Sequence, residues 1–514
     1  MLKFSVFLFF KPIMNFKILS IFSVSLLFNT LSATTISSSC NLDTGCTISK
    51  KEQKDELDQK QLFNMIRKGV VAIKVTAHMI LDKYVNDKMW HGTGFIVDLE
   101  KGLIVTNAHV AGEMAVCTYE VKFGNGRTAD ARLEYIDPCY DFAVLSVNKK
   151  DIPLYSLALN LSEKPISLNT TVYSMGNSNK NEFSTYKGYI FDTESILWLK
   201  SIAEQSFQFS GLTVPGASGS PVFDTKGEVV GVLYGGKFVS GAALPISYIK
   251  PVIDSLKEGK KFQRYFYGCI VNYTSIQNAV ESETIPQSIT PEYDEKFPNS
   301  NNKILYVSKK LTGFDPDKSL LESGDIIWKV EDELIGPELK RIDEIVQSKA
   351  GKNIKVTVYR NGNKKELELQ TYELSMDPKM KLLSFAGTTF FETTNELRIN
   401  LGKNSQAVYM TDSEVGSPFM EISNPTNGNY QGGAFQITSI DGKKVGSIDD
   451  IIDIIPTLFN KKVFIVKFIR LGTDMQENSI IMKYSPEFAE ATLYNFNRES
   501  KKWDVKAIKN PTQG

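Results

Sequence analysis

Between residues 70 and 245 the chain consists of many short apolar segments separated by turns, and this pattern restricts the fold more than any other feature. The segments are rich in Val, Ile and Phe, and few stretches show the helical period of about 3.6 residues. Such segments predict strands, which we expect at 70–75, 92–97, 102–106, 119–123, 131–136, 143–147, 171–175, 188–191, 221–224, 229–233 and 242–244. Many short strands with glycine-rich turns and hardly any helix predict antiparallel barrels or sandwiches.

Beyond residue 262 the order of elements changes, and the new order occurs twice. Residues 264–373 combine short strands with a helix expected at 342–348 and a hairpin around Asn361-Gly362. Residues 380–486 repeat this order, with a helix expected at 448–455. The repetition indicates two related small α+β modules, although few residues are identical between them.

Charge and composition exclude several classes of partner. The 514 residues include 59 Lys and Arg against 59 Asp and Glu, so the formal net charge is zero. Proteins that bind nucleic acid usually carry a basic excess, so no nucleic-acid partner is expected. The histidines are His78, His91 and His109, and no Cys/His cluster has the spacing of a zinc site. We therefore expect neither a metal nor another cofactor.

The N-terminus has the charged, apolar and small-residue order of a secretory signal peptide. Lys17 precedes the apolar run 18–28, and a small-residue segment ends at Ala33. We expect this segment to direct export, with Met1 or Met14 as the start of translation. The run is short for a membrane span, and an uncleaved anchor is the alternative. The expected location is therefore secreted or periplasmic, or membrane-anchored if the segment is not cleaved.

Five cysteines are few for a chain of this length, and their pairing is open. In an exported protein Cys40 could pair with Cys46, and Cys117 with Cys139, which would leave Cys269 over. The alternative is that the thiols are buried as small hydrophobic side chains.

A glycine-rich turn around Ser218 provides a candidate nucleophile. A hydroxyl attacks a carbonyl effectively only when a base takes its proton and nearby amides stabilise the oxyanion. Taken alone, such a turn is more often only a turn. His109 follows one expected strand and Asp141 precedes another, so both lie where a scaffold places functional residues. The chain order His109, Asp141, Ser218 is a known order for a catalytic triad.

Four segments together resemble the signature blocks of HtrA/Deg serine proteases. They are Thr93-Gly94-Phe95-Ile96-Val97, Val105-Thr106-Asn107-Ala108-His109-Val110, Tyr140-Asp141-Phe142-Ala143-Val144-Leu145 and Pro215-Gly216-Ala217-Ser218-Gly219-Ser220-Pro221-Val222. The resemblance implies a mostly β fold, with a chymotrypsin-like double β-barrel protease followed by two α+β PDZ-like domains. The expected segments are a signal peptide (1–33), a polar N-terminal arm (34–59), a trypsin-like serine protease domain (60–262), PDZ domain 1 (264–373), PDZ-like domain 2 (380–486) and a C-terminal tail (487–514).

The resemblance also assigns catalytic roles. Ser218 would be the nucleophile, His109 the general base and then acid, and Asp141 the group that orients His109. The backbone N–H groups of Gly216 and Ser218 would form the oxyanion hole, with that of Ala217 assisting. The family usually has Asn at the position of Ala217 and Gly at the position of Ser220.

Two binding sites are implied in the same way. Small apolar walls would line the primary substrate pocket and favour cleavage after small or medium aliphatic residues; the pocket residues are Ala242, Ala243 and Leu244. In PDZ domain 1, backbone amides would hold a peptide C-terminus while the peptide adds as a strand. The residues of this peptide-binding loop are Arg264, Tyr267, Gly268, Cys269 and Ile270.

The implied function is a serine endopeptidase that hydrolyses unfolded or misfolded proteins through an acyl-enzyme, as in protein quality control. The alternatives are a proteolytically weak chaperone or PDZ scaffold, and a dedicated processing protease. The implied partners are unfolded proteins, peptide C-termini at PDZ domain 1, and further copies of the chain in a homo-oligomer built from trimers. Peripheral association with a membrane stays open.

Overall fold

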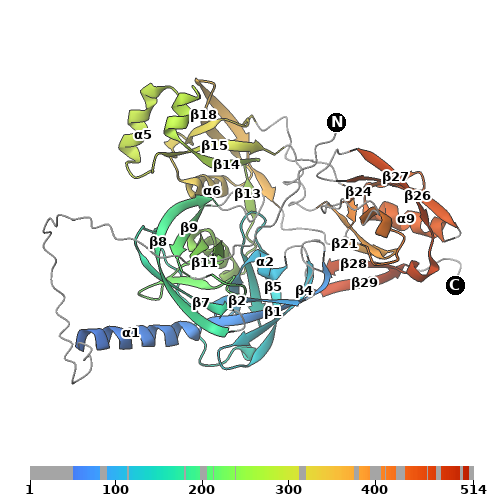
Figure 1. Ribbon diagram of the computed structural model, residues 1–514, viewed down its shortest axis with the longest axis horizontal. Helices are drawn as coiled ribbons and strands as arrows, with labels where there is room; N and C mark the ends of the chain where they lie inside the picture. Colours follow the sequence, from blue (N-terminus) through green and yellow to red (C-terminus); the bar gives the residue numbers. More distant parts are fainter. Residues whose placement is uncertain are drawn as a thin grey trace, which may run out of the picture. The chain divides into compact units, whose positions relative to one another are not determined.

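The computed structural model of the chain describes most residues between Lys50 and Ile508 (Figure 1). The described ranges are 50–80, 89–112, 115–178, 181–196, 205–211, 213–237, 239–311, 320–374, 381–393, 407–410, 413–423, 435–459, 461–470, 476–497 and 502–508. The expected signal peptide, Cys40 and Cys46 lie outside these ranges.

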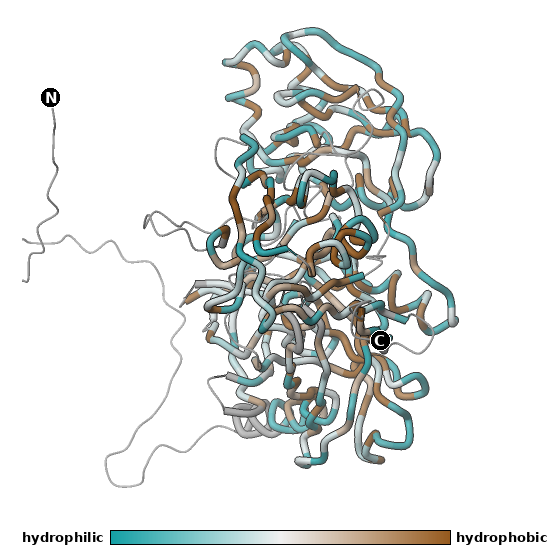
Figure 2. The backbone as a smooth tube through the Cα atoms, turned by 90° about the vertical axis from the view of Figure 1, so that its right-hand side faces the viewer, coloured by the Kyte–Doolittle hydropathy of each residue, from teal (hydrophilic) through white to brown (hydrophobic). Residues whose placement is uncertain are grey.

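The first barrel is a closed antiparallel sheet with the strand order β1-β2-β3-β6-β5-β4. Its strands are β1 (Val70–Ile80), β2 (Met89–Asp98), β3 (Leu103–Thr106), β4 (Ala115–Phe123), β5 (Thr128–Ile136) and β6 (Ala143–Val147). Alternate residues of β1, namely Val71, Ile73 and Val75, are fully buried, as the two-residue period of a strand requires. Figure 2 colours the backbone by hydropathy, and hydrophobic and hydrophilic segments are interspersed along the described chain.

The second barrel is closed in the order β10-β11-β12-β9-β8-β7. Its strands are β7 (Thr171–Ser178), β8 (Asn181–Ile196), β9 (Gln205–Ser210), β10 (Pro221–Asp224), β11 (Val229–Lys237) and β12 (Ser240–Pro245). The two closed barrels confirm the mostly β, double-barrel fold expected from the sequence. The sequence did not predict β9, whose apolar period rests on Phe207 and Phe209 alone.

Two helices pack at the margins of the barrels. Helix α1 (Lys50–Arg67) begins within the expected polar arm, and its Phe63 ring lies edge-on to that of Tyr173, with ring centroids 5.1 Å apart. Helix α3 (Lys250–Lys257) follows the second barrel and buries Val252 and Ile253.

Residues 264–374, called module 1 below, form the first α+β unit. Its main sheet has the order β14-β15-β16-β18-β19, with β17 paired to β16, and β13 pairs separately with β20. The hairpin turns at Asn361 and Gly362, whose φ angles of 50° and 74° suit a two-residue turn that needs left-handed residues. The elements are β13 (Arg264–Phe266), β14 (Cys269–Ser275), α4 (Ile276–Glu281), α5 (Thr290–Lys296), β15 (Lys303–Lys310), β16 (Ile326–Val330), β17 (Glu333–Leu334), α6 (Leu339–Lys349), β18 (Asn353–Arg360), β19 (Asn363–Gln370) and β20 (Tyr372–Leu374).

Residues 381–508, called module 2, form the second α+β unit. Its sheet has the order β27-β26-β24-β23-β22-β21-β28-β29, with β25 paired to β24. The segment after residue 486 was expected to be a separate tail, but β28 pairs with β21 and extends this sheet. The elements are β21 (Lys381–Phe385), β22 (Thr388–Glu392), β23 (Val408–Met410), α8 (Met420–Ser423), β24 (Phe435–Ile440), β25 (Lys443–Lys444), α9 (Ile448–Leu458), β26 (Val463–Arg470), β27 (Glu477–Lys483), β28 (Ala491–Asn497) and β29 (Lys502–Ile508).

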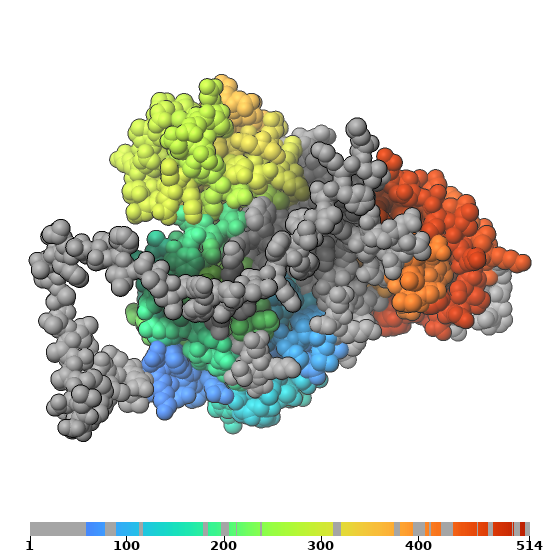
Figure 3. Space-filling model, in the orientation of Figure 1, coloured from blue at the N-terminus to red at the C-terminus, as the bar shows by residue number. Residues whose placement is uncertain are grey.

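The buried side chains divide unequally between the two modules. One hydrophobic cluster runs from the barrels into module 1 and includes Val105, Tyr140, Ile253, Val271 and Ile342. Another cluster is formed by residues of module 2 alone, from Leu383 to Leu493. Figure 3 draws module 1 mainly in yellow-green and module 2 in orange and red.

Candidate active site

His109 and Asp141 meet at one end of the first barrel because the strands that carry them are neighbours. Strand β3 leads through Asn107 into the short helix α2 (Ala108–Ala111), and it pairs with β6, which begins just after Asp141. The Nδ1 atom of His109 lies 2.7 Å from Oδ2 of Asp141, and the His109 backbone N–H donates to Oδ1 at 2.9 Å. Asp141 is buried while the His109 side chain is half exposed. The carboxylate therefore orients the imidazole and leaves its other face open to a substrate.

Asn107 adds a contact that sequence reasoning missed. Its side-chain Nδ2 donates to the backbone carbonyl of Asp141 at 2.8 Å, and the residue is fully buried. This bond joins the loop before α2 to the loop before β6. It therefore supports the relative placement of His109 and Asp141.

Ser218 lies in a turn before β10 that is hydrogen-bonded to the first barrel. The N–H of Thr93, on β2, donates to the Ser218 carbonyl at 2.8 Å, and the Thr93 hydroxyl donates to the Gly216 carbonyl at 2.9 Å. Gly219 has a φ of 87°, and a Cβ there would lie 1.9 Å from the Thr93 carbonyl oxygen. Only glycine permits this close approach. Because β2 pairs with β3, these bonds hold the serine turn to the barrel that carries His109 and Asp141.

The expected oxyanion-hole residues behave differently from one another. The Ala217 N–H donates to the Val214 carbonyl at 3.1 Å, so it is used inside the turn and does not face a substrate in this structure. Among the described residues, no backbone carbonyl accepts a hydrogen bond from the N–H group of Gly216 or of Ser218. Their role in the oxyanion hole stays a prediction, whereas Ala217 serves to close the turn.

Ser220, which stands where the family usually has glycine, braces the same turn. It is fully buried, and its hydroxyl donates to the Ala217 carbonyl at 2.5 Å. A Cβ on Gly176 would lie 1.8 Å from the Ser220 oxygen, so the serine fits against a glycine of β7. The hydroxyl thus supplies a contact within the turn that glycine lacks.

The predicted pocket residues are all buried in this structure. Ala242, Ala243 and Leu244 lie on β12 and are at most 1% exposed. Ala243 packs into the second barrel, while Ala242 and Leu244 belong to the cluster shared with module 1. None of them lines an open pocket here, and their role in substrate selection stays a prediction.

The predicted peptide-binding loop requires one correction, at Arg264. Arg264 is 1% exposed, and its guanidinium donates to the carboxylates of Asp137 and Asp343. A guanidinium occupied in this way is not available to a peptide carboxylate. The position of Arg264 just before the loop suggested a role in binding, and no local signal in the sequence pointed to its distant partners.

The rest of that loop has the placement that strand addition needs. Gly268 has a φ of 81° and its carbonyl accepts from the Leu311 N–H, and Cys269 and Ile270 begin β14. In the described sheet β14 is an edge strand that pairs with β15. Tyr267 is partly buried beside them. Binding of a peptide by Tyr267, Gly268, Cys269 and Ile270 stays a prediction.

The described cysteines form no disulfide, so the possible Cys117–Cys139 pair is wrong; Cys139 and Cys269 are buried thiols, and Cys117 is partly buried. Burial raises the pKa of Cys117 to about 12 and also raises that of Cys269, so both are thiols at neutral pH. In the part of the chain that the structure describes, no group of three His, Cys, Asp or Glu residues could hold a metal ion. No helix among these residues is long and apolar enough to cross a membrane.

Comparisons with known proteins match both parts of this architecture. Residues 92–232 match the model of the trypsin-like peptidase domain, and residues 297–371 match that of the PDZ domain. The chain is 28% identical, over 73% of its length, to the pro-apoptotic serine protease NMA111 of Pyricularia oryzae, and 26% identical, over 82%, to that of Chaetomium globosum. The chain is therefore similar to trypsin-like peptidase and PDZ domains and to these two serine proteases. It spans 36% and 40% of the lengths of these two relatives.

Solved structures similar to this chain include the HtrA-type protease AlgW with a tripeptide. The alignment covers 62% of this chain and 98% of that chain, with 22% identity and a TM-score of 0.46. A serine endoprotease from Yersinia pestis aligns with a TM-score of 0.40 and 20% identity, over 62% of this chain and 98% of that one. The trypsin-like peptidase model includes His109, Asp141 and Ser218 within its matched range.

Proposed function

We propose that the chain is a serine endopeptidase in which Ser218 attacks the substrate carbonyl and forms an acyl-enzyme. The observation that carries this proposal is the pair of hydrogen bonds from His109 to Asp141, at one end of the barrel to which the Ser218 turn is bonded. The trypsin-like peptidase match over the same residues supports it.

The proposed mechanism uses each member of the triad in turn. The Nε2 atom of His109 accepts the Ser218 proton as the oxygen bonds to the substrate carbonyl carbon, and the Asp141 carboxylate stabilises the imidazolium that forms. His109 then gives this proton to the leaving amine, which releases the first product and leaves Ser218 acylated. Water repeats the sequence, and hydrolysis returns Ser218 to its free form. The N–H groups of Gly216 and Ser218 would stabilise the oxyanion in both steps.

We further propose that the substrates are unfolded or misfolded proteins. The half-exposed His109 allows access by an extended chain. Selection of small apolar residues at the cleavage position by Ala242, Ala243 and Leu244 is a proposal that rests on the family resemblance. Peptide C-termini would bind at the β14 edge of the PDZ domain by strand addition. Export, and assembly into trimers, are proposals that rest on the N-terminal sequence and on the family resemblance.

The decisive test is replacement of the nucleophile in the purified full chain. We expect Ser218→Ala to abolish casein cleavage and labelling by a fluorophosphonate, while its thermal unfolding remains that of the unaltered chain. The matched control is Ser167→Ala, an exposed serine of the same domain, which should cleave casein at the unaltered rate. Casein cleavage by pure Ser218→Ala protein would contradict the assignment of Ser218 as the nucleophile.

The alternatives have distinct outcomes in the same assays. A degenerate chaperone or PDZ scaffold would fail to react with the fluorophosphonate even when folded, because only an activated serine reacts. A dedicated processing protease would react with the probe but leave casein intact.

A further inference from the structure

The loop that carries Asp141 is shaped by a second, buried aspartate. Asp137 and Phe142 close this loop, because the Asp137 N–H donates to the Phe142 carbonyl at 3.0 Å. The Oδ1 atom of Asp137 accepts the N–H groups of Cys139 at 2.8 Å and Tyr140 at 2.9 Å. The Asp137 carboxylate therefore determines the backbone path that ends at Asp141.

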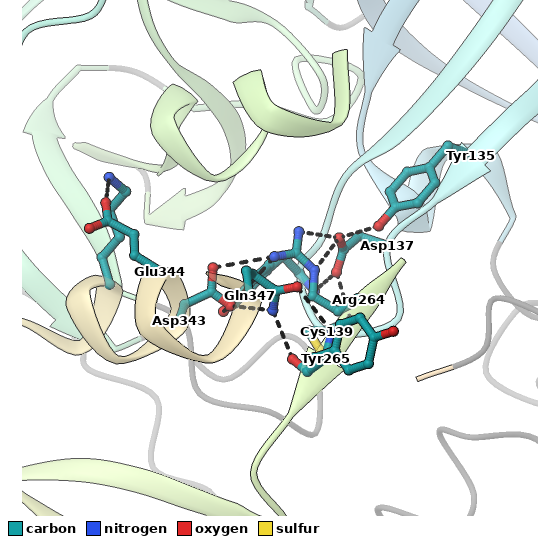
Figure 4. A network of polar contacts seen from close by, with 10 residues as sticks. Tyr135, Asp137, Cys139, Arg264, Tyr265, Asp343, Glu344 and Gln347 are labelled. Carbon is teal, nitrogen blue, oxygen red and sulfur yellow. Dashed lines mark hydrogen bonds and ion pairs between the residues drawn. The ribbon is translucent and has the colours of Figure 1, made fainter. Parts of the chain in front are cut away.

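Arg264 neutralises this carboxylate from the segment that leads into the PDZ domain. Its Nη2 and Nε atoms donate to Oδ2 of Asp137 at 2.6 and 3.0 Å, and the Tyr135 hydroxyl donates to the same oxygen at 2.7 Å. The guanidinium carbon also lies 4.8 Å from the centre of the Tyr140 ring. Figure 4 shows Arg264 between Asp137 on one side and Asp343 on the other. The side chains of Arg264 and Asp137 are 2% and 0% exposed.

Helix α6 of the PDZ domain completes the arrangement. Nη1 of Arg264 lies 3.3 Å from Oδ2 of Asp343, and the Tyr140 hydroxyl donates to Oδ1 of Asp343 at 2.9 Å. Gln347, one helical turn further on, exchanges two hydrogen bonds with the backbone of Tyr265. Tyr140, the neighbour of Asp141, is thus held both by the guanidinium and by a carboxylate of the PDZ domain.

The chemistry of the guanidinium explains why this position needs arginine. A buried ion pair adds little stability over apolar packing, but an unpaired buried carboxylate is strongly unfavourable. The planar fork of arginine can donate to two carboxylates and stack on a ring at once, which a lysine ammonium cannot do. Burial lowers the pKa of Arg264 and the two carboxylates raise it by more, so the group stays charged.

We propose that Arg264 is a positioning residue for catalysis, acting through Asp137 and Tyr140 on the loop that holds Asp141. This inference rests on the proposed protease function. When α6 is seated, Asp343 holds Arg264 and Tyr140 in place, and the loop presents Asp141 to His109. Loss of the arginine fork allows the loop to shift and misaligns the imidazole without removing any group that touches the substrate.

The test compares Arg264→Lys with the unaltered full chain, using a chromogenic peptide for kcat and KM and calorimetry for thermal unfolding. We expect kcat to fall by about 10-fold to 100-fold, as a small misplacement of catalytic groups produces, with KM unchanged within about twofold. The matched control is Arg360→Lys, because Arg360 forms a comparable forked pair with the buried Asp325 and is itself mostly buried, but this pair lies within module 1. It should leave kcat unchanged.

The outcomes separate this inference from the proposed function. An unaltered chain that neither cleaves peptide nor reacts with the fluorophosphonate contradicts the protease function itself. An active unaltered chain with equal kcat in Arg264→Lys overturns only the role of Arg264. If Arg264→Lys does not fold, Asp343→Asn replaces it: the Asp137 pair is then kept, and a lower kcat at constant KM is again required.

Discussion

The two α+β modules share an order of elements but differ in what holds them. Module 1 shares a hydrophobic cluster with the barrels and contributes Arg264 and Asp343 to a buried ionic contact with them. Module 2 has a cluster made of its own residues, centred on α9 and including Ile448, Ile451 and Ile455. Modules with the same order of elements can therefore share a hydrophobic core with the barrels, as module 1 does, or have a core of their own, as module 2 does.

The largest expected effect on kcat comes from truncating the chain. Ending the chain after residue 261 removes Arg264 and leaves the Asp137 carboxylate buried without its cation, so we expect cleavage of peptide to fall at least about tenfold. Ending it after residue 379 removes module 2 and should leave kcat unchanged. The measurement is kcat for both truncated chains, with unfolding followed by calorimetry. Equal kcat values of the two truncated chains would contradict a role in catalysis for module 1 that module 2 lacks.

Core substitutions test whether each module shares its stability with the barrels. Ile342→Ala in module 1 and Ile451→Ala in module 2 each remove a buried side chain, which typically costs about 2–5 kcal/mol of stability. We expect Ile342→Ala to lower the unfolding temperature of the barrels as well, since Ile342 belongs to their shared cluster. Ile451→Ala should lower only the unfolding temperature of module 2. Hydrogen exchange of the barrel peptides distinguishes the two, and unchanged barrel exchange in Ile342→Ala would argue against a shared core.

Helix caps provide a smaller test. Ser447 forms a capping box at α9, where its hydroxyl accepts the Asp450 N–H and the Asp450 carboxylate accepts the Ser447 N–H. Ser275 caps the short helix α4 of module 1 with a single bond from the Asn278 N–H. We expect Ser447→Ala to cost about 1 kcal/mol of stability and Ser275→Ala less. Chemical denaturation measures both, and kcat should not change in the Ser447 variant.

The smallest effect on stability is expected from partly exposed ion pairs. Lys303 of module 1 lies 3.8 Å from Asp192 and 3.6 Å from Glu194 of β8, and Lys381 of module 2 pairs with Asp449. Lys303→Met and Lys381→Met should each cost at most about 1 kcal/mol, because such pairs are partly solvated. Hydrogen exchange at residues 192–196 should increase in Lys303→Met alone. An increase in both variants would indicate a general loss of stability.

Much of the fold could be predicted from short-range patterns. Short apolar segments separated by turns located the strands of the first barrel, and the apolar residues of 448–455 located α9. The prediction failed for β9, whose few apolar residues carry a weak period, and for β28, which follows a segment without a turn motif. A strand is stabilised by its neighbours in the sheet, so a weak local pattern can still form one.

Some residues of the candidate site could likewise be predicted from local patterns, and others could not. His109, Asp141 and Ser218 were found because their residue types, order and strand-end positions are local and specific, and the structure joins the first two directly. Asn107, Thr93 and Asp137 were missed because polar residues beside strands are common in sequence. Arg264 was misassigned because its neighbours in the chain suggested a peptide-binding loop. Its partner Asp137 lies more than a hundred residues away in the sequence.

Residue types and their spacing were enough to predict a catalytic triad and the class of the domains, because a nucleophile, a base and a strand period are local properties of the chain. The folded chain was needed to show that Ala217 and Ser220 brace the serine turn, that β28 belongs to module 2, and that Arg264 links two aspartates. These contacts depend on which groups are buried together in the folded chain. A buried charge or N–H must find its partner wherever the folded chain supplies one, however distant that partner is in sequence.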